Sequence, residues 1–396
     1  MKRVALSTLS LAMLAAAGTA HAQSSVTLYG VIDESVQFVN NVKNANGANK
    51  NVFGLGGQNL QGNRWGLKGK EDLGGGLTAI FQLENGFSLN NGTLGQGNRM
   101  FGRQAYVGLD SAQYGTLTLG RQYDPIVDMV QGLTGDGYFG STFATPGDVD
   151  NNDNSSRINN SIKYTSPVIA GFQVAGMYAL GGVAGQTGSG QSWGAAATYG
   201  IGSFNVAAGY LKMDNGSTLA SRTAGTPPTV GWSSAATGDN INENQINAAY
   251  MSAKSIGIAQ AAAQYVAGPF TFGARYSNAQ YKPDAFSAFT SSQHFNTVGA
   301  FVGYQLNPAT LLGLGYNWTH GSGDVSNTYN QVSLGADYNL SKRTDLYVVA
   351  AYQHASGHQR NTDGSISSAG AAIASYNNDS ASDSQSMVNI GIRHKF

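Results

Sequence analysis

Most of the chain is built from short segments in which apolar side chains alternate with polar or small ones. In the stretch LTAIFQL at 77–83 every odd-numbered position is apolar, whereas Thr78, Gln82 and Glu84 share the other side. The stretch FTFGARY at 270–276 repeats the pattern. Successive side chains of a β-strand point to opposite faces, so this period of two predicts strands with one apolar and one polar face. Glu34 interrupts the apolar face of the opening strand.

The connections between these segments alternate between short and long. Tight Gly-, Pro- or Asn-containing turns are expected at 72–76, 110–115, 166–171, 200–203, 267–269, 307–309 and 341–343. Long polar connections are expected near 40–60, 87–98, 123–156, 181–191, 213–243, 282–293, 320–328 and 355–383. Seven short turns and eight long connections predict sixteen strands, with both termini on the side of the short turns. This asymmetry is typical of a bacterial outer-membrane β-barrel.

The composition supports strands that contact lipid and excludes several other classes of protein. Only 11% of the 396 residues are charged, against roughly 25% in an ordinary soluble domain. The formal net charge is +0, which argues against a nucleic-acid-binding protein. The absence of Cys excludes a disulfide scaffold and a thiolate metal site. No residue pattern indicates a cofactor or a metal ion.

The first 22 residues have the three parts of a secretory signal. Lys2 and Arg3 precede an apolar stretch at 4–17, and small residues end at Ala22. We therefore expect residues 1–22 to be a signal peptide and residues 23–396 to form a single domain. Because residues 23–396 contain no run of 18 apolar residues, a transmembrane helix is not expected there. The fold class expected is all-β, a sixteen-stranded antiparallel transmembrane barrel whose last strand ends at Phe396.

Several sequence blocks resemble the general porins of Gram-negative bacteria, and most of all the beta-proteobacterial type. They are SVTLYGVID at 25–33, NRWGLKGKEDLGGGLTAIFQLENGF at 63–87, FGRQAYVGL at 101–109, GTLTLGRQYD at 115–124, RINNSIKYTSP at 157–167, AGPFTFGARY at 267–276, LSKRTDLY at 340–347 and GIRHKF at 391–396. The blocks extend from one end of the expected domain to the other.

The resemblance implies an outer-membrane homotrimer of water-filled barrels rather than an enzyme. Small hydrophilic solutes and ions would diffuse through each pore, and the outer surface would contact lipid and lipopolysaccharide. The terminal strand with Phe396 would close the barrel and be recognised by the barrel-assembly machinery. The third long connection, 123–156, would fold into the lumen as a constriction loop. Its 34 residues are too many for a simple hairpin connection.

The same resemblance implies an arginine cluster on the pore wall, facing carboxylates on the constriction loop. Matching motifs give Arg64, Arg103 and Arg157 for the wall, at the second, fourth and sixth strands. Alternation supports the first of these independently, because Trp65 and Leu67 on the lipid side turn Arg64 inward. Secondary candidates on inward faces are Lys68, Lys70, Arg99 and Arg275.

The acidic side departs from the family pattern. Enterobacterial members have a glutamate at the loop tip where this chain has Tyr138. Asp136 is the best remaining loop acid, followed by Asp124 and Asp128. Three arginines facing about one carboxylate predict a weak to moderate preference for anions.

Two kinds of alternative function remain open from the sequence. One is a substrate-specific outer-membrane channel, which would need an aromatic track along the lumen. The other is an outer-membrane barrel enzyme, for which no adjacent lipid-facing Ser and His is apparent. The G-x-S-x-G match at 190–194 lies between a Gly-rich loop and a strand, not before a helix as a nucleophile elbow requires.

Overall fold

A computed structural model describes residues 25–182, 184–185, 189–216, 232, 239, 241, 244–374 and 378–396. The expected signal peptide at 1–22 lies outside these residues. The strands are β1 (Ser25–Lys43), β2 (Asn49–Leu55), β3 (Arg64–Gly74), β4 (Leu77–Gly86), β5 (Gln104–Ser111), β6 (Gly115–Gln122), β7 (Ile158–Thr165), β8 (Phe172–Ala179), β9 (Ser192–Ile201), β10 (Phe204–Asp214), β11 (Ser255–Ala267), β12 (Phe270–Lys282), β13 (Gln293–Asn307), β14 (Thr310–Ser322), β15 (Asn327–Asn339), β16 (Thr344–Arg360), β17 (Ile366–Ser368) and β18 (Ser384–Lys395). The short helices are α2 (Gly95–Asn98), α3 (Pro125–Met129), η1 (Gln131–Leu133), α4 (Asp136–Phe139), η2 (Gly140–Phe143), η3 (Pro146–Asp148) and η4 (Ala248–Tyr250). Among the helices of the described residues, none is both long enough and apolar enough to cross a bilayer.

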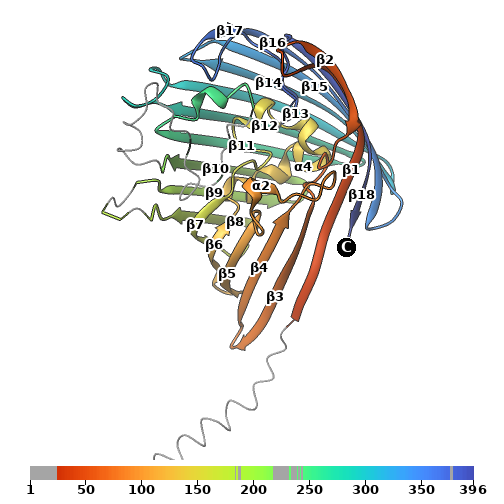
Figure 1. The fold of residues 1–396 in the computed structure, drawn as a ribbon. Coiled ribbons are helices and arrows are strands. Elements are labelled where there is room, and N and C mark those ends of the chain that lie inside the picture. The colour runs from red at the N-terminus through yellow and green to blue at the C-terminus, as the bar shows by residue number, and fades with distance from the viewer. Residues whose placement is uncertain are drawn as a thin grey trace, which may run out of the picture.

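Sixteen strands of the described chain close into one antiparallel barrel, which confirms the expected fold class. They are β1, β3 to β16 and β18, each paired with its neighbours. The first strand closes the barrel, because its segment 25–31 pairs with β3 and its segment 31–39 pairs with β18. The remaining two strands are short extensions, with β2 pairing on the far half of β1 and β17 on the end of β16. Figure 1 shows the first and last strands side by side.

The C-terminal residue takes part in this closure. The Gly30 amide donates to the carbonyl of Phe396 at 3.0 Å, and the Phe396 amide donates back to Gly30 at 3.1 Å. The chain therefore ends within the hydrogen-bonded sheet, as the alternation of its last residues predicts. A closed sheet leaves no unpaired edge, which is a requirement for strands that cross a membrane.

Side chains alternate between the barrel exterior and its interior, and the exterior is apolar. On β15, Val332 and Leu334 are exposed, whereas Gln331 and Ser333 are buried inside. The same alternation places Val388, Ile390 and Ile392 on the outer face of β18. An apolar belt around the barrel suits contact with lipid.

The seven short turns lie where the sequence predicts them, but some long connections extend past their expected limits. The connection after β4 continues to Arg103, beyond residue 98. The larger departure follows β10. β10 ends at Asp214 and β11 begins only at Ser255, so this connection extends beyond the predicted limit at residue 243. Ile246 and Tyr250, which follow that limit, are almost completely buried. This apolar part of the connection packs inside the barrel and contributes η4 rather than a strand.

Apolar side chains fill part of the lumen. The largest buried cluster combines Tyr281 and Phe295 of the wall with Tyr250 and Phe289 from the connections before β11 and β13. Tyr250 meets Phe289 edge to face, with ring centroids 4.9 Å apart. Ile126 and Val130 of the segment 123–156 join the same cluster. The open part of the lumen is therefore displaced toward the opposite wall.

Candidate functional site: the pore constriction

The constriction loop, residues 123–156, begins with a capped helical turn. The Asp124 carboxylate accepts hydrogen bonds from the amides of Ile126 at 2.8 Å and Val127 at 3.2 Å, and Pro125 occupies the first turn. This is a favourable start for a helix, because the cap satisfies amides that have no partner within the helix. Ile126 and Val130 then pack into the apolar cluster of the lumen. The chain is thus directed inward immediately after β6.

Two phenylalanines of the constriction loop occupy a notch made by inward-facing glycines. Phe139 is fully buried over Gly313 of β14 and Gly335 of β15, which are directly opposite in the register. Phe143 lies over Gly315, and its ring stacks on that of Phe139 with centroids 4.8 Å apart. A side chain at these wall positions would occupy the space of the rings. The glycines therefore allow the loop to lie close against β14 and β15.

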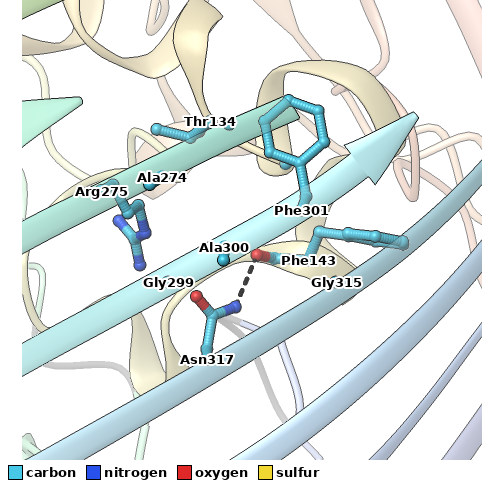
Figure 2. Close-up of a pocket in the computed structure, with 11 residues that line it drawn as sticks. Thr134, Phe143, Ala274, Arg275, Gly299, Ala300, Phe301, Gly315 and Asn317 are labelled. Carbon is cyan, nitrogen blue, oxygen red and sulfur yellow. Dashed lines mark hydrogen bonds between the residues drawn. The ribbon is translucent and has the colours of Figure 1, made fainter. Parts of the chain in front are cut away.

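Polar side chains of the wall also hold the backbone of the constriction loop. Asn317 donates to the carbonyl of Phe143 at 2.9 Å, as Figure 2 shows. Gln331 and Ser333 both donate to the carbonyl of Thr142, at 3.0 and 2.5 Å. These bonds satisfy loop carbonyls that are shielded from water, so they specify the position of the loop as well as stabilising it.

A buried ion pair anchors the second half of the constriction loop. Arg275 of β12 donates to Asp150 at 3.2 Å, and the Asp150 side chain is completely buried. Arg275 also bonds Thr145, and Ser277 bonds Asp150. Arg275 and Thr134 of the loop line the same small pocket, shown in Figure 2. Arg275 therefore lies on an inward face, as predicted, but it holds the loop and does not line the open lumen described next.

A cavity of about 1060 Å³, called here the pore cavity, remains between the constriction loop and the wall of β1, β3 and β4. Its charged lining residues are Arg64, Arg99, Arg103, Arg157, Glu84, Asp136, Asp153 and Asp239. Its aromatic lining residues are Tyr29, Phe87 and Tyr123. The predicted residues Arg64, Arg103, Arg157 and Asp136 thus come together around one cavity, although they are distributed over almost 100 positions of the chain.

Glu84 lies among the wall arginines. Its carboxylate accepts from Nε of Arg103 at 2.8 Å and lies 4.0 Å from Nε of Arg64. The hydroxyls of Tyr29 and Tyr123 also donate to Glu84, at 2.8 and 3.0 Å. Arg103 is buried and donates further to the Tyr123 hydroxyl at 2.7 Å. One carboxylate is therefore shared by two guanidinium groups on the same side of the pore.

Arg157 differs from its neighbours because it forms no ion pair within the described chain. Its guanidinium lies over the ring of Tyr123, 5.8 Å from the centroid, and donates to the carbonyl of Ser155 at 3.1 Å. Its Nε has no hydrogen-bond partner. Only 6% of the residue is exposed, so the charge is poorly hydrated and its field extends into the cavity.

A second shared carboxylate comes from the connection between β10 and β11. Asp239 lies 2.9 Å from Nη1 of Arg99 and also bonds Nη2 of Arg121. Arg121 belongs to β6 and stands beside the pore cavity. Together Arg64, Arg99, Arg103, Arg121 and Arg157 form what we call the arginine wall.

The three predicted loop acids lie in different environments. Asp136 lines the pore cavity, where burial raises its pKa to about 6 and the Asp148 carboxylate adds to the rise. Asp124 caps α3, where burial also raises its pKa to about 6. Asp128 forms an ion pair with Lys163 of β7 at 2.5 Å. Neither Asp124 nor Asp128 lines the pore cavity. Asp124 accepts hydrogen bonds from Ile126, Val127 and Asn151 of the loop itself, whereas Asp128 ties the loop base to the wall.

The other predicted residues are placed as follows. Tyr138 is half-buried, tilted against Phe301 with centroids 5.1 Å apart, and accepts a hydrogen bond from Gln264. It therefore faces the wall rather than the lining of the pore cavity. Lys68 lies over the ring of Tyr29, and Lys70 is exposed farther along β3. Arg99 follows α2 in a connection rather than standing on a strand, yet it lines the pore cavity.

Three residues of the site were not predicted from the sequence: Glu84, Arg121 and Asp239. Glu84 could have been found, because it shares the polar face of its strand with Gln82. Within the described residues, no group of three or more His, Cys, Asp or Glu has the arrangement of a metal site.

A closed barrel with an apolar exterior and a charged, narrowed lumen defines a passive channel of the outer membrane. Residues 7–358 match the family model described as Gram-negative porin. Outer membrane porin protein 32 of Delftia acidovorans is 30% identical over 98% of this chain and 99% of its own length. An outer membrane porin protein of Bordetella pertussis is 39% identical over a shorter region, 40% of this chain and 43% of the relative.

The chain belongs to the Gram-negative porin family. Among solved structures, an anion-selective porin from Comamonas acidovorans superposes with a TM-score of 0.68 at 23% identity, covering 94% of this chain and all of the other. At this level of identity the likeness shows the shared fold. Like its porin relatives, the protein is an outer-membrane channel for small solutes. It is not an enzyme.

Proposed function

We propose that this porin is a general diffusion pore with a weak to moderate preference for anions, set by the arginine wall. The observation that carries the proposal is the imbalance on that wall, where four of the five guanidinium groups share the two carboxylates of Glu84 and Asp239, and the fifth, Arg157, has no ion pair in the described chain. On the loop side, Asp136 and Asp153 face the cavity, and the raised pKa of Asp136 reduces its average charge. An anion passing the constriction is therefore stabilised more than a cation.

The anion selectivity named for the Comamonas acidovorans porin supports the same proposal. The lining also supports a general pore over a substrate-specific one. Its three aromatic residues, Tyr29, Phe87 and Tyr123, are few for a continuous aromatic track, and two of their hydroxyls are bonded to Glu84. Liposome swelling with sugars of increasing radius should decline smoothly with size and show no saturation by one sugar.

The anion preference is tested by the reversal potential of the channel in a planar bilayer under a KCl gradient. The wild type should give a chloride-to-potassium permeability ratio above one. Replacing Arg64, Arg103 or Arg157 singly by Ala should lower that ratio about threefold, since each removes one positive charge at close range. Arg343→Ala is the matched control, because it removes an exposed arginine in the turn before β16. A cation-preferring wild type would refute the proposal.

We further propose that the channel is exported by a signal peptide at residues 1–22 and assembles as a homotrimer in contact with lipid and lipopolysaccharide. Glu34 lies on the outward face of β1 between Ile32 and Val36, and one of its carboxylate oxygens is buried without a hydrogen-bond partner. An unpaired carboxylate on the lipid side of the barrel is unfavourable, which supports a subunit contact there. The hydrogen bonds between Phe396 and Gly30 support a role of the last strand in closure by the assembly machinery. Cross-linking in intact outer membranes should give a trimer, and a monomer alone would contradict the assembly.

A further inference from the structure

Asp239 links three separate parts of the pore wall. Its carboxylate lies between Arg99, in the connection after β4, and Arg121 of β6. Its amide donates to the carbonyl of Arg157 at 3.2 Å, and its own carbonyl accepts from the hydroxyl of Ser156 at 2.9 Å. The residue is 7% exposed and lines the pore cavity. Both its backbone and its side chain are therefore specified by contacts within the constriction.

The two wall carboxylates, Glu84 and Asp239, each form ion pairs with two different arginines. Glu84 is shared by Arg64 and Arg103, and Asp239 is shared by Arg99 and Arg121. Arg157 has no ion pair in the described chain. Each shared carboxylate cancels part of the positive potential near the cavity, so the strength of that potential depends on both of them. Glu84 is part of the barrel wall, whereas Asp239 reaches the wall from a connection more than 100 residues farther along the chain.

We infer that Asp239 determines how strongly the pore prefers anions, by partly neutralising Arg99 and Arg121 at the constriction. The inference rests on the proposed anion preference and names the residue that limits it. Arg99 is the more exposed partner, with 36% of its side chain accessible. When Asp239 is neutral, its negative charge no longer offsets that of Arg99 at the constriction. The pore should then favour anions more strongly than the natural channel does.

The test compares reversal potentials of the full-length channel and three variants under the same KCl gradient. Asp239→Asn should raise the chloride-to-potassium permeability ratio about threefold, because one negative charge is lost next to the permeation path. Asp239→Glu keeps the charge and should remain close to the wild type. The double variant Arg99→Gln with Asp239→Asn loses one charge of each sign, so its ratio should return most of the way to the wild-type value.

Asp324→Asn is the matched control. Asp324 is also a salt-bridged carboxylate in a connection, held 2.6 Å from Nε of Arg360 with 4% of its side chain exposed, but it is not a lining residue of the pore cavity. Its neutralisation should leave the ratio unchanged. An unchanged ratio in Asp239→Asn, or an equal rise in Asp324→Asn, would overturn the inference. The permeability ratio of the wild type tests the proposed anion preference separately. If the wild type prefers cations but Asp239→Asn still raises the chloride-to-potassium ratio, the proposed anion preference is refuted and the role of Asp239 is not.

Discussion

Adding one methyl group to the glycine notch should displace the constriction loop. In Gly335→Ala, the new Cβ would lie 2.8 Å from Cε1 of Phe139 and closer still to Cδ1. Carbon atoms pack best at about 3.5–4.0 Å, so the ring would have to move by about 1 Å. It cannot move across the notch, because Gly313 on β14 already touches the opposite edge of the ring. The remaining direction is away from the wall, toward the lumen.

The displacement has both an energetic and a functional consequence. Overpacking a buried site costs about 1–3 kcal/mol, so the barrel should denature at a lower temperature. Phe139 ends α4, and the first residues of the same turn, Asp136 and Gly137, line the pore cavity. A shift of α4 away from β15 therefore narrows the cavity. We expect a lower single-channel conductance than in the wild type.

The assay is single-channel recording in planar bilayers, combined with thermal denaturation of the folded barrel. Gly176→Ala on β8 is the matched control, since a Cβ at that position has no atom within 4 Å. The control should behave as the wild type in both measurements. If Gly335→Ala keeps the wild-type conductance and denaturation temperature, the glycine notch does not position the loop.

Two further predictions concern the charges of the loop. Because the pKa of Asp136 is raised to about 6, the carboxyl becomes neutral as the pH falls from 7 to 5, and the anion permeability ratio should rise about twofold. Asp136→Asn should show a much smaller change over this range, and a wild-type ratio that is flat or falls would contradict the assignment. Arg275→Ala leaves the Asp150 carboxylate buried without its cation, which should destabilise the barrel by about 3–5 kcal/mol. Gel-shift analysis after heating measures the loss of stability as a lower temperature at which the folded barrel denatures. An unchanged denaturation temperature would refute the anchoring role of the Arg275–Asp150 pair.

The strands and their closure could be predicted because period-two alternation is a local signal. A strand such as β15 alternates Gln331 and Ser333 with Val332 and Leu334, so each face is evident from neighbouring residues alone. The same reasoning placed Arg64 inward. For Arg103 and Arg157, which lie just outside β5 and β7, alternation gave little help, and the family resemblance identified them instead.

Arg121 shows where alternation is misleading. Leu117 and Leu119 face outward on β6, so a regular strand would place Arg121 outside as well. The register shifts between Gly120 and Gln122, and Gly120 has a φ of 143°, a conformation that favours glycine. Such an irregularity adds a residue on one strand and redirects the side chains that follow. Arg121 is therefore buried on the inner side, where it meets Asp239.

In the proposed mechanism, ion pairs between distant segments set the ion selectivity of the pore, and the number of charged residues does not. The whole chain has a formal net charge of +0, and even a count of lining residues balances Arg64, Arg99, Arg103 and Arg157 against four carboxylates. The positive and negative charges differ in how they are paired. Arg157 has no ion pair in the described chain, whereas Glu84 and Asp239 each pair with two arginines. No local pattern specifies that Asp239 meets β6, because that contact exists only after the barrel has closed and the constriction loop is in place.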